Sequence, residues 1–238
     1  MQNVNVEICC GSIQSAANAR VAGATRIELC QNLNQGGTTP SYATICQCVE
    51  DLHLDVFVLV RPRPGDFVYN PLEIDNMARD VQVCKDCGVA GIVVGFLHPD
   101  GHVDKELTRR FVELAAPLPV TFHRAFDRCP DWRQALEDVI DCGCKRILTS
   151  GCKPTAEEGK ETLRELVKTA GERITILMGG GVRSENVRDL LEYTDVQEVH
   201  GSCKRLMPNG SEETDSAEVT RLLEVCRWGW NCNQNNMV

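Results

Sequence analysis

The sequence predicts an α/β protein made of a single (βα)8 barrel, the TIM-barrel architecture. An apolar, β-branched run, a polar turn and a helical stretch recur in that order eight times along the chain. The length of 238 residues suits one such barrel, which typically needs roughly 250 residues. The first strand leads into CCGSIQSAAN, which lacks the GxGxxG turn of many doubly wound sheets, so an open sheet is the weaker prediction.

The predicted strands alternate with helices throughout the chain. We place the strands near residues 4–9, 26–30, 56–61, 91–95, 120–125, 146–149, 174–179 and 197–200. A helix between every two strands implies parallel strands joined by right-handed crossovers. Eight such units favour a closed barrel over an open sheet.

Capping residues predict where the helices begin and end. Ser12, Ser41 and Thr155 each precede a helical stretch, and Pro71 is suited to the first turn of another. A glycine is expected to end four of the helices: Gly23, Gly88, Gly143 and Gly171.

Two stretches interrupt the repeat. Residues 202–215 follow the eighth strand and read as a loop, which is either a lid over the barrel mouth or a solvated connection. Residues 227–238 read as a C-terminal tail, so the barrel domain is expected to span residues 1–226.

The charge and hydropathy patterns exclude several classes of function. A formal net charge of −9 provides no basic field for phosphate backbones or anionic lipid, so we expect neither a nucleic-acid nor a membrane partner. No apolar run approaches the length of a membrane span, and residues 1–10 lack the pattern of a secretory leader. We therefore expect a cytoplasmic protein.

The fourteen cysteines are scattered through strand-like and helix-like segments, at a density below that of disulfide scaffolds. Most are expected to be reduced. The sequence has no pair of CxxC motifs, so a structural zinc site is not expected. His98 and His102 lie across a Pro-Asp-Gly turn, which argues against a helical pair of metal ligands.

Strand alternation assigns two Glu-x-Cys pairs to the barrel interior. In a barrel of this kind, functional groups lie at the carboxyl ends of the strands, and successive side chains alternate between the interior and the helices. The first strand is expected to direct Glu7 and Cys9 inward, and the second to direct Glu28 and Cys30 inward.

Other strand ends add more polar groups. Inward charges must be paired or solvated, so as a set they predict a wet, charged pocket. For single residues the alternative is a structural ion pair, such as Glu7–Arg61 or Glu28–Arg63. The further candidates, from the third, fifth and eighth strands, are Arg61, Arg63, Asp66, His123, Glu198 and His200.

The loops after the seventh and eighth strands predict an anion site. Gly180, Gly181, Gly201 and Ser202 offer backbone N–H groups where barrels of this fold often bind phosphate. Thr149 adds a hydroxyl beside them. The alternative is that these glycines serve only tight turns.

Six motifs, in order, resemble the CutC family, which is named for copper homeostasis. They are VEICCGSIQSAANARVAGATRIELC, NQGGTTPS, VLVRPRPGDFVYN, TFHRAFDRC, RILTSG and MGGGVRSENV, and the likeness runs from about residue 4 to 202. The chain departs from the family at VHGSCK, at the paired Cys9–Cys10 and in its cysteine-containing tail. The resemblance implies a cytoplasmic TIM barrel that is usually a homo-oligomer and is proposed to bind Cu(I).

The copper ligands proposed for the family correspond to Cys9 and Cys30. Soft thiolates suit Cu(I), and adjacent strands would bring the two sulfurs together for two-coordinate binding. The alternative is that both are ordinary buried core cysteines.

Two functions from different classes remain open. The first, implied by the resemblance, is Cu(I) binding at the barrel mouth in copper homeostasis. The second, drawn from the residues, is an enzyme for a small anionic substrate, sugar-like or phosphorylated, without an organic cofactor. Here Arg61 would bind the anion while Glu28 and His123 exchange protons. A scaffold for oligomer contacts is a third possibility, which the inward charges disfavour.

Overall fold

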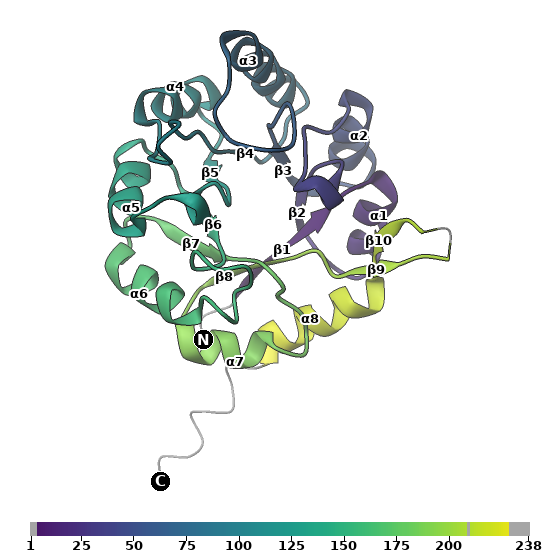
Figure 1. Ribbon diagram of the computed structural model, residues 1–238. Coiled ribbons are helices and arrows are strands. Elements are labelled where there is room, and N and C mark those ends of the chain that lie inside the picture. The colour runs from purple at the N-terminus through teal and green to yellow at the C-terminus, as the bar shows by residue number, and fades with distance from the viewer. Residues whose placement is uncertain (1–3, 209, 229–238) are drawn as a thin grey trace.

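The computed structural model describes residues 4–208 and 210–228. Its centre is a closed barrel of eight parallel strands, which confirms the predicted fold (Figure 1). Each strand pairs with the next along the chain, and β8 closes the barrel against β1. The strands are β1 Asn5–Cys10, β2 Arg26–Leu29, β3 Asp55–Leu59, β4 Gly91–Val94, β5 Val120–Phe122, β6 Arg146–Thr149, β7 Thr175–Met178 and β8 Glu198–Gly201.

Helices surround the barrel (Figure 1). A π-helical turn, η2 (Gln47–Asp51), continues α2, and the short 3-10 helices η1 (Leu33–Gln35) and η3 (Phe126–Arg128) follow β2 and β5. None of the helices in the described part of the chain is long and apolar enough to cross a membrane. The α-helices are α1 Ile13–Val21, α2 Tyr42–Cys46, α3 Pro71–Asp86, α4 Lys105–Ala115, α5 Trp132–Asp141, α6 Lys160–Ala170, α7 Val187–Thr194 and α8 Ser216–Trp228.

The predicted helix starts are confirmed except for one. Ser12 and Ser41 accept hydrogen bonds from the first-turn amides of α1 and α2, and Pro71 opens α3. The start predicted after Thr155 is wrong, because α6 begins only at Lys160. The Ala156 amide instead donates to Gly180 O (2.8 Å), which ties this segment to the loop after β7 before a helix can form.

The connection after β8 is not the irregular loop that the sequence predicts. It contains an antiparallel hairpin of β9 (Lys204–Leu206) and β10 (Glu212–Thr214). Thr214 attaches the hairpin to α1, since its N–H donates to Ser15 Oγ (3.1 Å) and its carbonyl accepts from Asn18 (2.9 Å). The predicted tail starts inside α8, and its residues 229–238 lie outside the described part of the chain.

Apolar packing occurs on both faces of the barrel wall. Outward residues such as Ile8 and Ile27 are fully buried between the strands and the helices. A smaller cluster lies inside the barrel, near its carboxyl end, and consists of Cys9, Cys30, Phe57, Leu59 and Val93. Cys9 and Cys30 therefore face inward, as strand alternation predicts.

A buried ion cluster spans the barrel interior below these thiols. Arg26 lies 3.2 Å from Glu7 and 2.6 Å from Glu198, and Arg146 lies within 3.8 Å of both carboxylates. Burial raises the pKa of Glu7 and lowers that of Arg146. The ion pairs Glu7–Arg61 and Glu28–Arg63, considered from sequence, are therefore wrong: Glu7 pairs with these two arginines and Glu28 pairs with His200.

We predict that Arg146→Met lowers the free energy of unfolding by about 3–5 kcal/mol, because removing one partner leaves buried carboxylate charge uncompensated. Urea denaturation at neutral pH measures the change. Arg173→Met is the matched control, since Arg173 pairs with Glu137 at 2.7 Å on the surface with both side chains 46% exposed, and it should change stability far less. Equal effects from the two variants would contradict the prediction.

Candidate functional site

A cavity of about 420 Å³ opens at the carboxyl ends of the barrel strands. Its wall combines strand ends with the loops after β2, β3, β5, β7 and β8. Among the residues that the sequence analysis singled out, those lining it are Cys9, Glu28, Cys30, Arg61, His123, Gly180, Gly181, His200, Gly201 and Ser202.

Cys9 and Cys30 form a thiol pair on neighbouring strands. Cys9 lies opposite Glu28 in the β1–β2 register, and the Cys30 amide donates to Cys10 O (3.0 Å), which extends the pairing of the two strands. The hydrogen bond between the two thiols, together with burial, raises the pKa of Cys9 well above its usual value. Both sulfurs are therefore held close together and Cys9 is protonated at neutral pH.

Buried Glu28 and partly buried His200 form an acid–base pair. His200 Nε2 lies 2.9 Å from Glu28 Oε2 and 3.9 Å from Glu7 Oε1. Burial alone would lower the pKa of His200, but the hydrogen bond and charge of Glu28 raise it. Burial alone would likewise raise the pKa of Glu28, but hydrogen bonds from His200 and Cys9 lower it. Both shifts favour the charged forms, a carboxylate on Glu28 and an imidazolium on His200.

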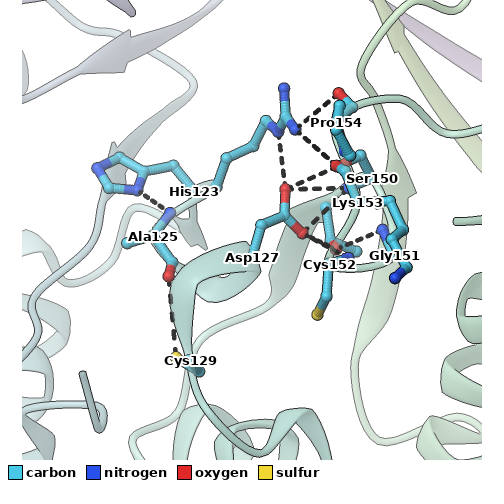
Figure 2. A network of polar contacts seen from close by, with 11 residues as sticks. His123, Ala125, Asp127, Cys129, Ser150, Gly151, Cys152, Lys153 and Pro154 are labelled. Atoms are coloured by element: carbon cyan, nitrogen blue, oxygen red, sulfur yellow. Dashed lines mark hydrogen bonds and ion pairs between the residues drawn. The ribbon is translucent and has the colours of Figure 1, made fainter. Parts of the chain in front are cut away.

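His123 is held in the opposite protonation state. Burial, with the nearby charge of Arg61, lowers its pKa to about 4. The Ala125 amide donates to His123 Nδ1 (3.1 Å), so the proton resides on Nε2 (Figure 2). Within residues 4–208 and 210–228, Nε2 is buried without a hydrogen-bond partner. Gly95 provides the room, since a Cβ there would lie 2.3 Å from the ring.

Arg61 reaches the cavity wall but is largely occupied by backbone carbonyls. Its guanidinium donates to Gly36 O (3.0 Å), Gly37 O (2.9 Å) and Gly65 O (2.9 Å), and it lies over the Phe67 ring. These bonds join the loops after β2 and β3. Among the described residues, Arg61 Nε is buried without a hydrogen-bond partner, and the anion-binding role of Arg61 stays a prediction.

Four predicted ligand-binding residues lie outside the cavity lining. Glu7 belongs to the ion cluster below it. Arg63 pairs with Glu73 (2.6 Å) and Asp66 (2.9 Å) at the protein surface. Thr149 is fully buried, donates to Asp127 and accepts from the Gly151 amide. These four residues do not line the cavity, and their ligand-binding role stays a prediction.

Asp127 organises the mouth and was not singled out from sequence. Its carboxylate accepts from the amides of Ser150 (3.2 Å) and Cys152 (3.1 Å) and from Arg124 Nε (2.8 Å), which joins the loops after β5 and β6 (Figure 2). Asp127 is the last residue of the motif TFHRAFD, but it lies in η3, beyond the end of the strand, where strand alternation no longer predicts the direction of a side chain.

Three cations at the cavity rim were also missed. Arg124, Arg183 and Lys204 line the cavity and are between 38 and 41% exposed. Arg183 and Lys204 directly follow the glycine-rich turns MGGGV and HGSC, so the available signal was a basic residue next to a predicted anion loop.

Among the described residues that line the cavity, two sets of side chains have metal-ligand chemistry. One is the thiol pair of Cys9 and Cys30. The other brings together Cys9, Glu28 and His200, whose ligand atoms all lie within 4.8 Å of one another.

The fold and this mouth define a TIM-barrel protein with a thiol- and histidine-lined site at the carboxyl end of its strands. The chain belongs to the CutC family, whose model matches residues 4–205, as the sequence motifs predicted. It is 46% identical over 199 residues to a CutC family protein of Chromobacterium violaceum, which covers 84% of this chain and 81% of that protein.

A human relative and a crystal structure extend the comparison. The human copper homeostasis protein cutC homolog is 42% identical over 212 residues, or 89% of this chain and 78% of that protein. The crystal structure of the putative copper homeostasis protein CutC from Streptococcus agalactiae is 34% identical, with a TM-score of 0.80 over 84% of this chain and 98% of that one.

We predict that His123 makes folding stability depend on pH. Its folded-state pKa of about 4 lies below the ordinary 6.5, so the stabilisation is fully present above pH 6.5 and is lost as pH falls toward 4. Between pH 7.5 and 5, the native chain should lose about 2 kcal/mol more unfolding free energy than a His123→Gln variant.

Urea denaturation at the two pH values measures this difference. His53→Gln is the control, because it makes the same change at an exposed histidine and should leave the pH dependence as in the native chain. Identical pH dependence in the native chain and the His123→Gln variant would show that His123 is not held neutral by the fold.

Proposed function

We propose that this chain binds Cu(I) through Cys9 and Cys30 and acts in copper homeostasis. The observation that carries this proposal is the contact between two buried thiols from adjacent strands at the wall of an open cavity. Soft thiolates are preferred ligands of Cu(I). The names of the human and Streptococcus agalactiae relatives, which both refer to copper homeostasis, support the same role.

The surroundings of the thiol pair suit a reduced, soft metal. Phe57, Leu59 and Val93 pack against the two cysteines and keep that side of the site apolar. Coordination requires both thiols to lose their protons, so protons compete with the metal at a buried pair. Two thiolates and one Cu(I) carry a net negative charge, which the imidazolium of His200 on the neighbouring strand offsets.

The thiol chemistry requires reducing conditions, as in the cytoplasm. The cytoplasmic location and the homo-oligomer that the resemblance implies stay predictions.

We predict one equivalent of tight Cu(I) in the native, reduced chain and loss of that equivalent in Cys9→Ser/Cys30→Ser. An anaerobic titration against a chelator of known Cu(I) affinity measures it. The control is Cys144→Ser/Cys226→Ser, which removes two buried thiols outside the cavity lining and should keep the tight equivalent. Tight binding that survives in the first variant would contradict the proposal, because another set among the fourteen cysteines would then be responsible.

A second function, an enzyme acting on a small anionic substrate, is favoured by the size of the cavity and by the charged side chains that line it. One Cu(I) ion needs far less space than 420 Å³. The N–H groups of Gly180, Gly181 and Val182 have no acceptor among the described residues, and Arg183 lies next to them. His123 Nε2–H and the pair of Glu28 and His200 provide groups for proton transfer at the same cavity.

We predict that inorganic phosphate or a simple sugar phosphate raises the melting temperature of the native chain, and raises it less in Arg183→Met. A thermal shift series at constant ionic strength measures both. Arg133→Met is the control, because Arg133 is an exposed residue on α5 and the same charge is lost. Equal shifts in the two variants would mean that the anion does not bind at the glycine-rich mouth.

A further inference from the structure

Three different ligand types converge where β1, β2 and β8 end. The ligand atoms of Cys9, Glu28 and His200 lie within 4.8 Å of one another, and the three strands are consecutive around the barrel. All three residues line the cavity, and each belongs to a strand. The cluster is therefore held by the barrel wall itself.

We propose that Cys9, Glu28 and His200 form a site for a divalent cation of the Zn²⁺ class, which shares Cys9 with the two-thiol Cu(I) site but uses a different set of ligands. Thiolate, carboxylate and imidazole together are ligands that Zn²⁺ accepts, whereas the hard carboxylate of Glu28 suits Cu(I) poorly. A thiolate, a carboxylate and a neutral imidazole carry two negative charges, which match a divalent ion.

The spacing of the atoms fits such an ion after a small adjustment. With bonds of roughly 2.0–2.3 Å, the ligand atoms of a tetrahedral zinc lie roughly 3.3–3.6 Å apart. Glu28 and His200 are now 2.9 Å apart, and no distance within the group exceeds 4.8 Å. Side-chain rotations that move the ligand atoms by about an ångström suffice. The metal then replaces the proton in the hydrogen bond between Glu28 and His200.

The fourth coordination position would face the cavity. Three protein ligands and one open position are typical of catalytic zinc sites, whereas structural sites use four protein ligands. His123 lines the same cavity and presents a buried Nε2–H without an acceptor. That N–H is available to a molecule that enters the cavity and approaches the metal.

The two metal sites share Cys9, so one occupant excludes the other. This inference does not depend on Cu(I) binding, because the Zn²⁺ site requires Glu28 and His200 but not Cys30. The Cu(I) site requires Cys30 but neither of those two. Single substitutions therefore separate the two proposals.

Co²⁺ alone is the probe, because a thiolate ligand to Co²⁺ gives a charge-transfer absorption that reports the sulfur directly. Titration of the reduced chain without oxygen should give one equivalent with this band. Loss of an outer-shell partner already costs roughly 10- to 100-fold in metal affinity, so Glu28→Gln and His200→Asn should each weaken binding by at least this much, and Cys30→Ser should leave the affinity within about threefold. Glu224→Gln and His98→Asn repeat the two substitutions at exposed positions and should match the native chain.

Unchanged binding in Glu28→Gln and His200→Asn would overturn the proposal, and so would loss of the band in Cys30→Ser. X-ray absorption at the zinc edge of the native, Zn²⁺-loaded chain gives an answer even where a variant fails to fold. One sulfur with nitrogen and oxygen neighbours supports the site, and two or more sulfurs contradict it.

Discussion

The pairing of buried charge across the barrel interior is the constraint on which the mouth depends. Glu7 and Glu198 are tolerated there only because Arg26 and Arg146 reach them from other strands. Arg146 also lies 3.8 Å from the centre of the Phe57 ring, and that ring packs against the thiol pair. Gly91 makes this layer possible, since a Cβ at this position would lie 2.1 Å from Phe57. The Phe57 ring thus connects the ion cluster to the thiols that line the cavity.

Sequence periodicity was enough to predict the closed barrel and the inward direction of Cys9, Glu28 and Cys30. Both follow from local rules, namely the alternation of strand and helix and the two-residue period within a strand. The same rules place polar strand ends at one mouth. Neither rule depends on which strands lie opposite one another across the barrel interior.

Ion-pair partners could not be predicted, because they depend on barrel closure. Arg146 meets Glu7 although 139 positions separate them in the chain, from 7 to 146. Strand alternation says that a charge faces inward but not what it meets there. The late start of α6 and the β9–β10 hairpin have the same origin, since contacts to β7's loop and to α1 decide them. Asp127 was missed because it follows its strand in a 3-10 helix, where alternation no longer applies.

The two histidines of the cavity show how one barrel mouth holds opposite proton affinities. His123 is buried and His200 is only 12% exposed, and burial alone would favour the neutral form of both imidazoles. The Glu28 carboxylate favours the charged form of His200. The Ala125 N–H donates to His123 Nδ1, which can accept this hydrogen bond only when it is unprotonated. A cation that displaces the His200 proton and a molecule that accepts from His123 Nε2 would occupy the same cavity without competing for the same group. The separation of the two proton states, more than any single residue, is the feature on which the proposed binding of a metal and a polar molecule at one mouth depends.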